Sequence, residues 1–550
     1  MNASFSLIFG VPGQGMPLHL NALSLFFLAL LLPQVVASAS AGMRRSVFFW
    51  VSVAGLVLVF AAGGPFMLVF GAGLMGLATW GMAAQTNGRQ ATSYARTVAF
   101  GIASLIAGLS LPVSSLGFIL TVLGVSAVGG LLPLWGRLPH TYALLPPPMA
   151  AFLSGGGVNL VFYTLIHYGL VAGAEGQHPW WGVGLMAVGA LSALVGAFRA
   201  GLDVDLRNVL SWTTTAASGL IVIGIGAALW ANSAGYQELS ALALQSVLLF
   251  ILAHGLFKPL MFIGAGEVLQ AVGTVSLNWL GGLMRGMPRL GMLMLLGATG
   301  VAMLPLGPAF APVFLLIHAA IGIALTGGAL ACLGCTALLV VIGVSVALLL
   351  LAGIKIIGFG FLGRPRSLQA AAAEDIRSGP LWGMVLLAGL CLPMALVPGF
   401  VMFFNAAVIN TLIPSALETE LAYAPLTVCL LAGLAFAAAA LVQTRKGSRG
   451  LRETATWNGG FGHPPAWLPF GDPKTQPTAS ALTEALLTNF SQTAKIVVCF
   501  RHFPVLWKRL HNRGMRLIRS MENISPRLGL VIMFVALVLS LLIFSFAQKG

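Results

Sequence analysis

Residues 247–266 read VLLFILAHGLFKPLMFIGAG, a run of 20 residues whose one charged side chain is Lys258. About 20 apolar residues are what an α-helix needs to cross the hydrocarbon core of a bilayer. A charge within such a run is costly, so an ionisable group there is a candidate for function. The stretch predicts a transmembrane helix near 239–268 that carries a polar site.

The rest of the chain has the same character. Of 550 residues, 58% are hydrophobic and 7% are charged, whereas a soluble domain carries charge on about a quarter of its residues. Apolar runs of transmembrane length recur along nearly the whole sequence. This composition excludes a soluble domain, and it predicts an all-α polytopic membrane protein whose first partner is the lipid bilayer.

We expect spans near 21–41, 46–63, 66–84, 97–112, 116–136, 148–172, 180–199, 209–231, 239–268, 290–306, 311–327, 330–360, 381–397, 421–443 and 526–547. The stretch 290–363 is ambiguous, because three full crossings would place Arg364 and Arg366 opposite the other basic loops. We therefore expect one piece to be broken or re-entrant at 304–308, where Pro and Gly free backbone groups at membrane depth. A second such place is 132–139.

Basic residues gather in alternate loops, which indicates orientation. The turns at 63–65, 112–115, 172–180 and 231–238 contain no Lys or Arg, whereas the loops between them carry Arg44, Arg45, Arg89, Arg96, Arg137, Arg199, Arg207, Arg285 and Arg289. By the positive-inside rule these loops are cytoplasmic and the amino terminus lies outside. The net charge of +15 therefore reflects orientation in a bacterial inner membrane, and we expect no nucleic-acid partner.

The chain divides into an expected transmembrane domain at 1–443, a Gly- and Pro-rich loop at 444–477, a basic amphipathic helix at 478–525 and a final span at 526–550. The amphipathic part has apolar residues at helical spacing. Its basic side chains oppose a single acid, Glu522: Lys495, Arg501, Lys508, Arg509, Arg513, Arg516, Arg519 and Arg527. Such a helix lies along a membrane surface or clamps partner subunits.

The five cysteines point to no redox centre. Cys332 and Cys335 have CxxC spacing but lie in an apolar stretch without a second pair or a nearby His, so helix packing explains them better than a metal site. We expect no cofactor and no metal in this chain, and any electron transfer would belong to partners.

Several strings resemble one family. Residues 254–260 (HGLFKPL) and 262–266 (FIGAG) are similar to its HALFKxLLFLGAG motif, and 205–212 (DLRNVLSW) to its cytoplasmic turn. Three further strings resemble motifs found in the hydrogenase branch of this family: residues 361–367 (FLGRPRS), 456–460 (TWNGG) and 478–480 (TAS). The family is that of the antiporter-like membrane subunits of the hydrogenase 4 component B and formate hydrogenlyase subunit 3 type, related to complex I and Mrp antiporters.

The resemblance implies about 14 transmembrane helices with two inverted five-helix repeats and a cytoplasmic lateral helix, for which 478–525 is suited. Family members begin with roughly two more helices than the match at 20–24 (LNALS) leaves room for, so we expect a shortened amino terminus. The resemblance also implies partners: other membrane subunits and a peripheral hydrogenase- or dehydrogenase-like arm.

Four residues are candidates for a proton path. Lys258 and His254 lie one turn apart on one helix face, and Lys355 matches a family lysine on a late helix, although a lysine there could also snorkel to the interface. His318 lies in an apolar run, where a hydrogen-bonded core histidine is the more common explanation.

Four other family positions carry no charge here. The match places Gly73 at the family glutamate, Val128 and Asn159 at two lysines, and Val313 at a later acid. Up to Ala174 the chain has no Asp, Glu or Lys, so a Glu–Lys pair cannot titrate in the first half.

The sequence favours a non-catalytic membrane subunit of a hydrogenase-type or complex I-like oxidoreductase whose own proton path is degenerate. The alternative is an active proton- or cation-translocating subunit that uses Lys258 and Lys355. A stand-alone antiporter is a third possibility.

Overall fold

The computed structural model describes residues 3–7, 16–111, 114–132, 134, 138–172 and 178–413, scattered positions between 430 and 441, and 477–481, 483 and 484. The expected loop at 444–477, apart from Pro477, lies outside these residues. So do the expected lateral helix beyond Glu484 and the final span at 526–550.

The described chain is built mainly from helices: α1 (Ala22–Ser40), α2 (Val47–Phe60), α3 (Pro65–Ala84), α4 (Gly88–Ser110), α5 (Ser115–Gly129), α6 (Leu138–Leu144), α7 (Pro147–Phe152), α8 (Asn159–Ile166), α9 (Pro179–Leu202), α10 (Leu206–Ser233), α11 (Gln237–Val272), α12 (Leu283–Gly286), α13 (Pro288–Val301), α14 (Phe310–Thr326), α15 (Gly328–Lys355), α16 (Leu368–Ala371), α17 (Ser378–Leu396) and α18 (Pro398–Leu412). A 3₁₀ turn, η1 (Met43–Arg45), and three π-helical segments, η3 (Leu153–Gly157), η4 (His167–Ala172) and η5 (Ile356–Phe361), complete the helical part.

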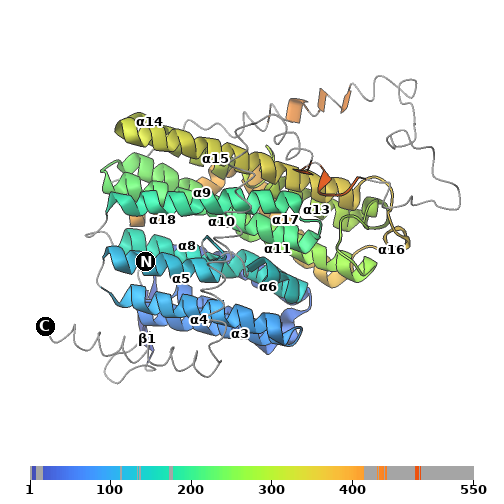
Figure 1. Ribbon diagram of the computed structural model, residues 1–550, viewed down its shortest axis with the longest axis horizontal. Helices are drawn as coiled ribbons and strands as arrows, with labels where there is room; N and C mark the ends of the chain where they lie inside the picture. The colour runs from blue at the N-terminus through green and yellow to red at the C-terminus, as the bar shows by residue number, and fades with distance from the viewer. Residues whose placement is uncertain are drawn as a thin grey trace.

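Most of these helices are built to cross a membrane. In the described residues eight helical stretches have the length and hydropathy of a span, and five shorter helices are apolar. Figure 1 shows them side by side, with α3 and α4 at one side of the molecule and α14 and α15 at the other. The chain is a multi-pass membrane protein, while the count of 14 spans and the two inverted repeats stay predictions.

Two elements differ from the all-helical expectation. Strands β1 (Ala3–Leu7) and β2 (Met16–Leu20) form an antiparallel pair, and the His19 amide donates to the Ala61 carbonyl at the end of α2. The sequence between the strands holds Gly10, Pro12, Gly13 and Gly15, residue types that favour turns. The all-α prediction is therefore wrong for this hairpin.

The second difference is α18, which begins directly after α17 and was not among the expected spans. Pro398 stands at its first turn, a position that proline fills without losing a hydrogen bond. The Pro-Gly pair at 398–399 predicts the end of a helix, but a new helix, α18, begins there at once.

The ambiguous region at 290–363 has one broken crossing, as expected. Met303 and Leu306 adopt positive φ between α13 and α14, at the predicted 304–308 interruption. The amides of Gly281 and Gly282 donate to the Gly360 and Leu362 carbonyls, so the chain before α13 and the chain after α15 lie on the same side. We conclude that α13 and α14 are two halves of one crossing and that α15, continued by η5, is the return.

Glycines allow the closest helix contacts. A Cβ added to Gly219 of α10 would lie 2.4 Å from the Ala193 amide nitrogen of α9, and one added to Gly189 would lie 2.6 Å from the Gly219 carbonyl oxygen. Small residues at interfaces are how helices associate in lipid, where the hydrophobic effect gives no attraction between them. This pairing fixes α9 against α10, which positions the loop at 203–205.

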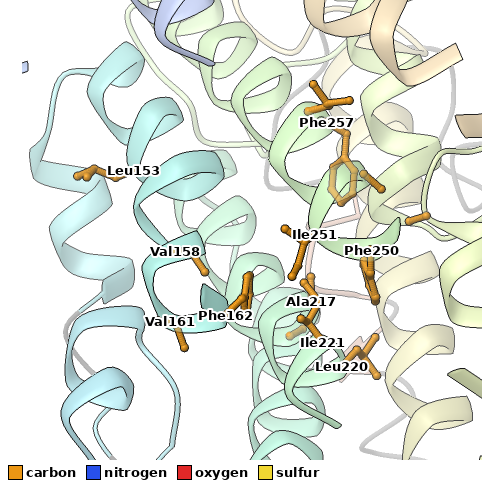
Figure 2. Packing of buried hydrophobic residues seen from close by; sticks show 14 of the residues in the cluster. Leu153, Val158, Val161, Phe162, Ala217, Leu220, Ile221, Phe250, Ile251 and Phe257 are labelled. Carbon is orange, nitrogen blue, oxygen red and sulfur yellow. The ribbon is translucent and has the colours of Figure 1, made fainter. Parts of the chain in front are cut away.

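The core lies where α8, α10 and α11 meet. Phe162 of α8 lies toward Ala217 and Ile221 of α10 and toward Ile251 of α11, all within one buried cluster (Figure 2). His254 comes about one turn further along α11 and Lys258 about two, so the apolar core borders directly on the candidate site.

Candidate functional site

Lys258 and His254 are fully buried near the middle of α11. The Lys258 Nζ donates to the Leu210 carbonyl oxygen at 3.1 Å and to the Thr213 hydroxyl. Both acceptors belong to α10 and both are uncharged. Lys258 is therefore held inside the protein, away from an interface. Its hydrogen-bond partners among the described residues are neutral.

His254 packs its ring edge-on against Phe257, with 5.7 Å between ring centroids. Neither of its ring nitrogens has a hydrogen-bond partner among the described residues. It lies on the same side of α11 as Lys258, as the spacing predicted, but no hydrogen bond joins the two.

Lys355 ends α15 and is also buried, at 2% exposure. Its Nζ donates to three carbonyl oxygens: those of Ala200 at 2.6 Å, Gly201 at 2.9 Å and Asp203 at 2.6 Å. Snorkelling to an interface is therefore not its role. Its acceptors lie where α9 ends, whereas those of Lys258 lie within α10.

His318 lies apart from these residues. It is on the exposed side of α14, where its Nδ1 pairs with the Phe314 carbonyl oxygen at 2.9 Å and its ring lies 4.2 Å from that of Phe314. The structure brings Lys258 and His254 together but brings neither Lys355 nor His318 to them.

One of the missing family charges, at Val128, falls at a small neutral cavity. Val128 of α5 lines it together with the hydroxyl-bearing residues Thr79, Tyr94, Thr141 and Tyr142. The cavity leaves about 10 Å³ for the centre of a water molecule, roughly the space that one water needs. No side chain that lines it carries a charge, so it can hold a dipole but cannot store a proton at neutral pH.

Asn159, Gly73 and Val313 complete the set. Asn159 is buried, and its side-chain amide has no hydrogen-bond partner among the described residues. A Cβ on Gly73 would meet nothing within 4 Å, so lack of space does not account for glycine at this position. Val313 is buried in α14 among apolar neighbours.

The π-helical segment η3 explains how α1 and α11 approach this region. Its glycines leave room for both helices: a Cβ on Gly155 would lie 2.4 Å from Pro259 Cγ, and one on Gly156 would lie 2.7 Å from Gln34 Oε1. Gln34 in turn donates its Nε2 to the Gly255 carbonyl oxygen at 2.8 Å. π-Bulges inside helices frequently mark functional sites.

Arg207 was expected in a cytoplasmic loop, and that expectation is wrong for its side chain. The guanidinium is buried and donates to the Tyr142 and Leu145 carbonyl oxygens near the end of α6. A signal was present in the sequence, because Asp205 caps α10 and so places Arg207 in the first helical turn. A cation is unfavourable there unless it is paired elsewhere.

The buried cations therefore share one kind of partner. Lys258, Lys355 and Arg207 all donate to backbone carbonyls, and only Lys258 adds a hydroxyl. The ion pair found in the described part of the chain joins Arg289 and Asp375 at the surface, 4.0 Å apart. The described residues do not bring together three or more His, Cys, Asp or Glu side chains that could hold a metal ion. The thiols of Cys332 and Cys335 are free.

Residues 16–340 match the family described as NADH:quinone oxidoreductase/Mrp antiporter, TM. The chain belongs to this family. The resemblance predicted from the 254–266 motif is thus confirmed.

Curated members of the family cover part of the chain. Hydrogenase-4 component B of Escherichia coli is 27% identical over 385 residues, which cover 67% of this chain and 57% of that protein. An uncharacterized protein of Mycobacterium tuberculosis is 36% identical over 282 residues, 51% of this chain and 44% of that protein. The chain spans about half the length of the curated relatives it matches.

Solved structures share the fold over most of the chain. The archaeal membrane-bound sulfane sulfur reductase has a chain with a TM-score of 0.71 and 17% identity, covering 98% of this chain and 91% of that one. A chain of respiratory complex I from Thermus thermophilus has a TM-score of 0.60 and 18% identity, covering 75% and 88%. At these identities the likeness establishes the fold.

Proposed function

We propose that this family member is a non-catalytic membrane subunit of a hydrogenase-type or complex I-like assembly in a bacterial inner membrane, and that its own proton path is degenerate. The observation that carries the proposal is the neutral cavity of Val128, Thr79, Tyr94, Thr141 and Tyr142. One of its lining residues, Val128, stands where the family pattern predicts a lysine.

The physical reason is that a proton path needs groups that change charge. In a proton-pumping subunit, a lysine gains its proton when a carboxylate lies beside it and loses the proton when that carboxylate moves away. The reason is that an opposite charge favours the charged form of the lysine. Among the residues that the structure describes, Lys258 has the Leu210 carbonyl and the Thr213 hydroxyl as its hydrogen-bond partners. Neither changes its charge, so nothing at this site switches the lysine between its two forms.

The assembly part of the proposal rests on the relatives and on the surface. Component B is by its name one component of a hydrogenase, and the structural neighbours come from a respiratory membrane complex and from complex I. In the most apolar part of α15 and η5, 28% of the residues are buried within the chain. The rest form an apolar face for lipid or for another membrane subunit.

A second function is favoured by one observation. Lys258 and Lys355 are both buried, and ionisable groups at membrane depth are functional candidates by default. An active translocating subunit would use these two lysines with His254, and its first half-channel would have to conduct through hydroxyl groups and water.

Affinity purification of the tagged chain from its native membrane tests the assembly. We expect stoichiometric co-purification of other membrane subunits together with a peripheral hydrogenase- or dehydrogenase-like arm. A chain that purifies alone under several mild detergents, and that exchanges cations for protons in proteoliposomes by itself, would contradict the proposal and support a stand-alone antiporter.

A further inference from the structure

The contacts of Lys355 require its charged form. An ammonium group has three N–H donors, whereas a neutral amine has two. The Nζ atom is within 2.9 Å of three backbone carbonyl oxygens, on Ala200, Gly201 and Asp203. All three bonds exist together only when the lysine is protonated. Lys258, with two acceptors, does not have this requirement.

The three carbonyls belong to the end of α9. Ala200 and Gly201 lie in its last turn, and Asp203 follows directly. The last carbonyls of a helix have no partner within the helix, and the negative end of the helix dipole lies there. Lys355 therefore caps α9 from another element. The backbone carbonyls bind its charge directly, and the nearby Asp203 carboxylate, which accepts from the Asp205 amide 3.1 Å away, adds a favourable electrostatic interaction.

A distant segment of the chain docks onto one of the same carbonyls, that of Gly201. The Thr483 hydroxyl donates to the Gly201 carbonyl oxygen at 3.0 Å, and the Ala479 amide donates to Asn278 Oδ1 at 2.8 Å. Arg366 Nη1 donates to the Pro477 carbonyl oxygen at 3.0 Å. Ala479 and Thr483 are buried. We call residues 477–481, 483 and 484 the docking segment. It stands at the start of the predicted lateral helix at 478–525.

We propose that Lys355 is a positioning residue: a fixed cation that caps α9 and, through the Gly201 carbonyl it shares with Thr483, holds the docking segment against the transmembrane domain. It anchors the start of the predicted lateral helix and does not carry protons. This inference goes beyond the proposed function, because it assigns Lys355 a role of its own and removes it from the path that an active subunit would use.

Thiol accessibility at Ala479 measures the docking directly. Ala479 is buried, and Ala479→Cys keeps both the backbone amide that donates to Asn278 and the Thr483 hydroxyl that donates to Gly201. The variant is made in the full chain, in native membranes, with the five native cysteines replaced by alanine or serine. We expect its thiol to react slowly with a soluble maleimide.

Lys355→Met in this background should raise the initial rate of labelling by about tenfold, since charge-assisted hydrogen bonds are the strong ones. Lys355→Arg should stay near the parent rate, because guanidinium supplies a permanent charge and several donors but cannot release its proton. Gln245→Leu, which removes a buried amide of α11 that faces α18, is the matched control and should be labelled at the parent rate.

The outcomes separate anchoring from proton transfer. A parent rate in Lys355→Met would overturn the proposal, and so would a Lys355→Arg rate as high as that of Met. If Lys355→Met fails to accumulate, accumulation and slow labelling of Lys355→Arg support the proposal, while the same failure in Arg overturns it. Asn278→Ala, which removes the acceptor for the Ala479 amide but leaves Lys355 in place, should also speed the labelling, and a parent rate would show that the segment does not dock as described.

Discussion

Replacing each buried lysine with methionine should change the stability of the chain in opposite directions. Lys258→Met removes a charge from the middle of α11 and leaves no orphaned carbonyl, because Leu210 O still accepts from the Thr213 and Thr214 hydroxyls, each at 2.9 Å. Burying an ion has a desolvation penalty of several kcal/mol, so replacing it with an apolar side chain should range from neutral to about 3 kcal/mol stabilising.

Lys355→Met has the opposite consequence. The Gly201 carbonyl keeps Thr483 as a donor, but the carbonyls of Ala200 and Asp203 lose the donor they had in Lys355. A buried acceptor left without a partner costs about 1–3 kcal/mol, so two such acceptors predict a loss of about 2–6 kcal/mol.

The assay is the temperature at which half of the detergent-solubilised chain no longer elutes as a folded species from a sizing column. We expect this temperature to be unchanged or higher for Lys258→Met and clearly lower for Lys355→Met. Equal losses in both variants would refute the reasoning, since they would mean that the charge of Lys258 is as firmly bound as that of Lys355.

Three further outcomes test the topology, one helix cap and one helix contact. A membrane-impermeant thiol reagent added from the periplasm should label Tyr236→Cys but not Leu362→Cys, in an otherwise cysteine-free chain, and the reverse pattern would invert the topology. Asp205→Ala should lose about 1 kcal/mol because Asp205 caps α10, while Asp205→Asn keeps the cap. Since burial raises the pKa of the Asp205 carboxyl, stability should decline slightly as pH rises from its ordinary pKa to the raised one, and Asp205→Asn should lack this decline in a denaturation series over pH. Gly219→Val should abolish accumulation of the folded chain, because a Cβ there meets the α9 backbone, whereas Gly343→Ala, with nothing within 4 Å of the added atom, should accumulate normally on immunoblots.

The sequence predicted the parts of the fold that depend on local pattern. The apolar run at 247–266 became the core of α11, and the Pro–Gly string at 304–308 became the break between α13 and α14. These succeed because hydropathy and proline act within a few residues of the chain. The α18 helix was missed for the same reason, since Pro398 suggests a break when its tertiary neighbours are unknown.

The candidate site was harder to predict, because its chemistry depends on contacts across the sequence. Lys355 and Ala200, 155 residues apart, meet only after α9 and α15 pack together. Spacing placed His254 and Lys258 on one face of α11, but it could not show that His318 lies on the exposed side of α14. Burial of Arg207 was equally non-local, since its acceptors belong to α6 and the turn that follows.

The most direct test of a degenerate proton path is proton translocation per turnover by the purified assembly in proteoliposomes, compared between the parent and Lys258→Met and normalised to assembled complex. The account predicts the same ratio in both, because the neutral partners of Lys258 and the uncharged cavity around Val128 give the lysine no proton to pass on. A variant that assembles normally but translocates at a small fraction of the parent ratio would contradict it, and would make Lys258 the relay of an active subunit.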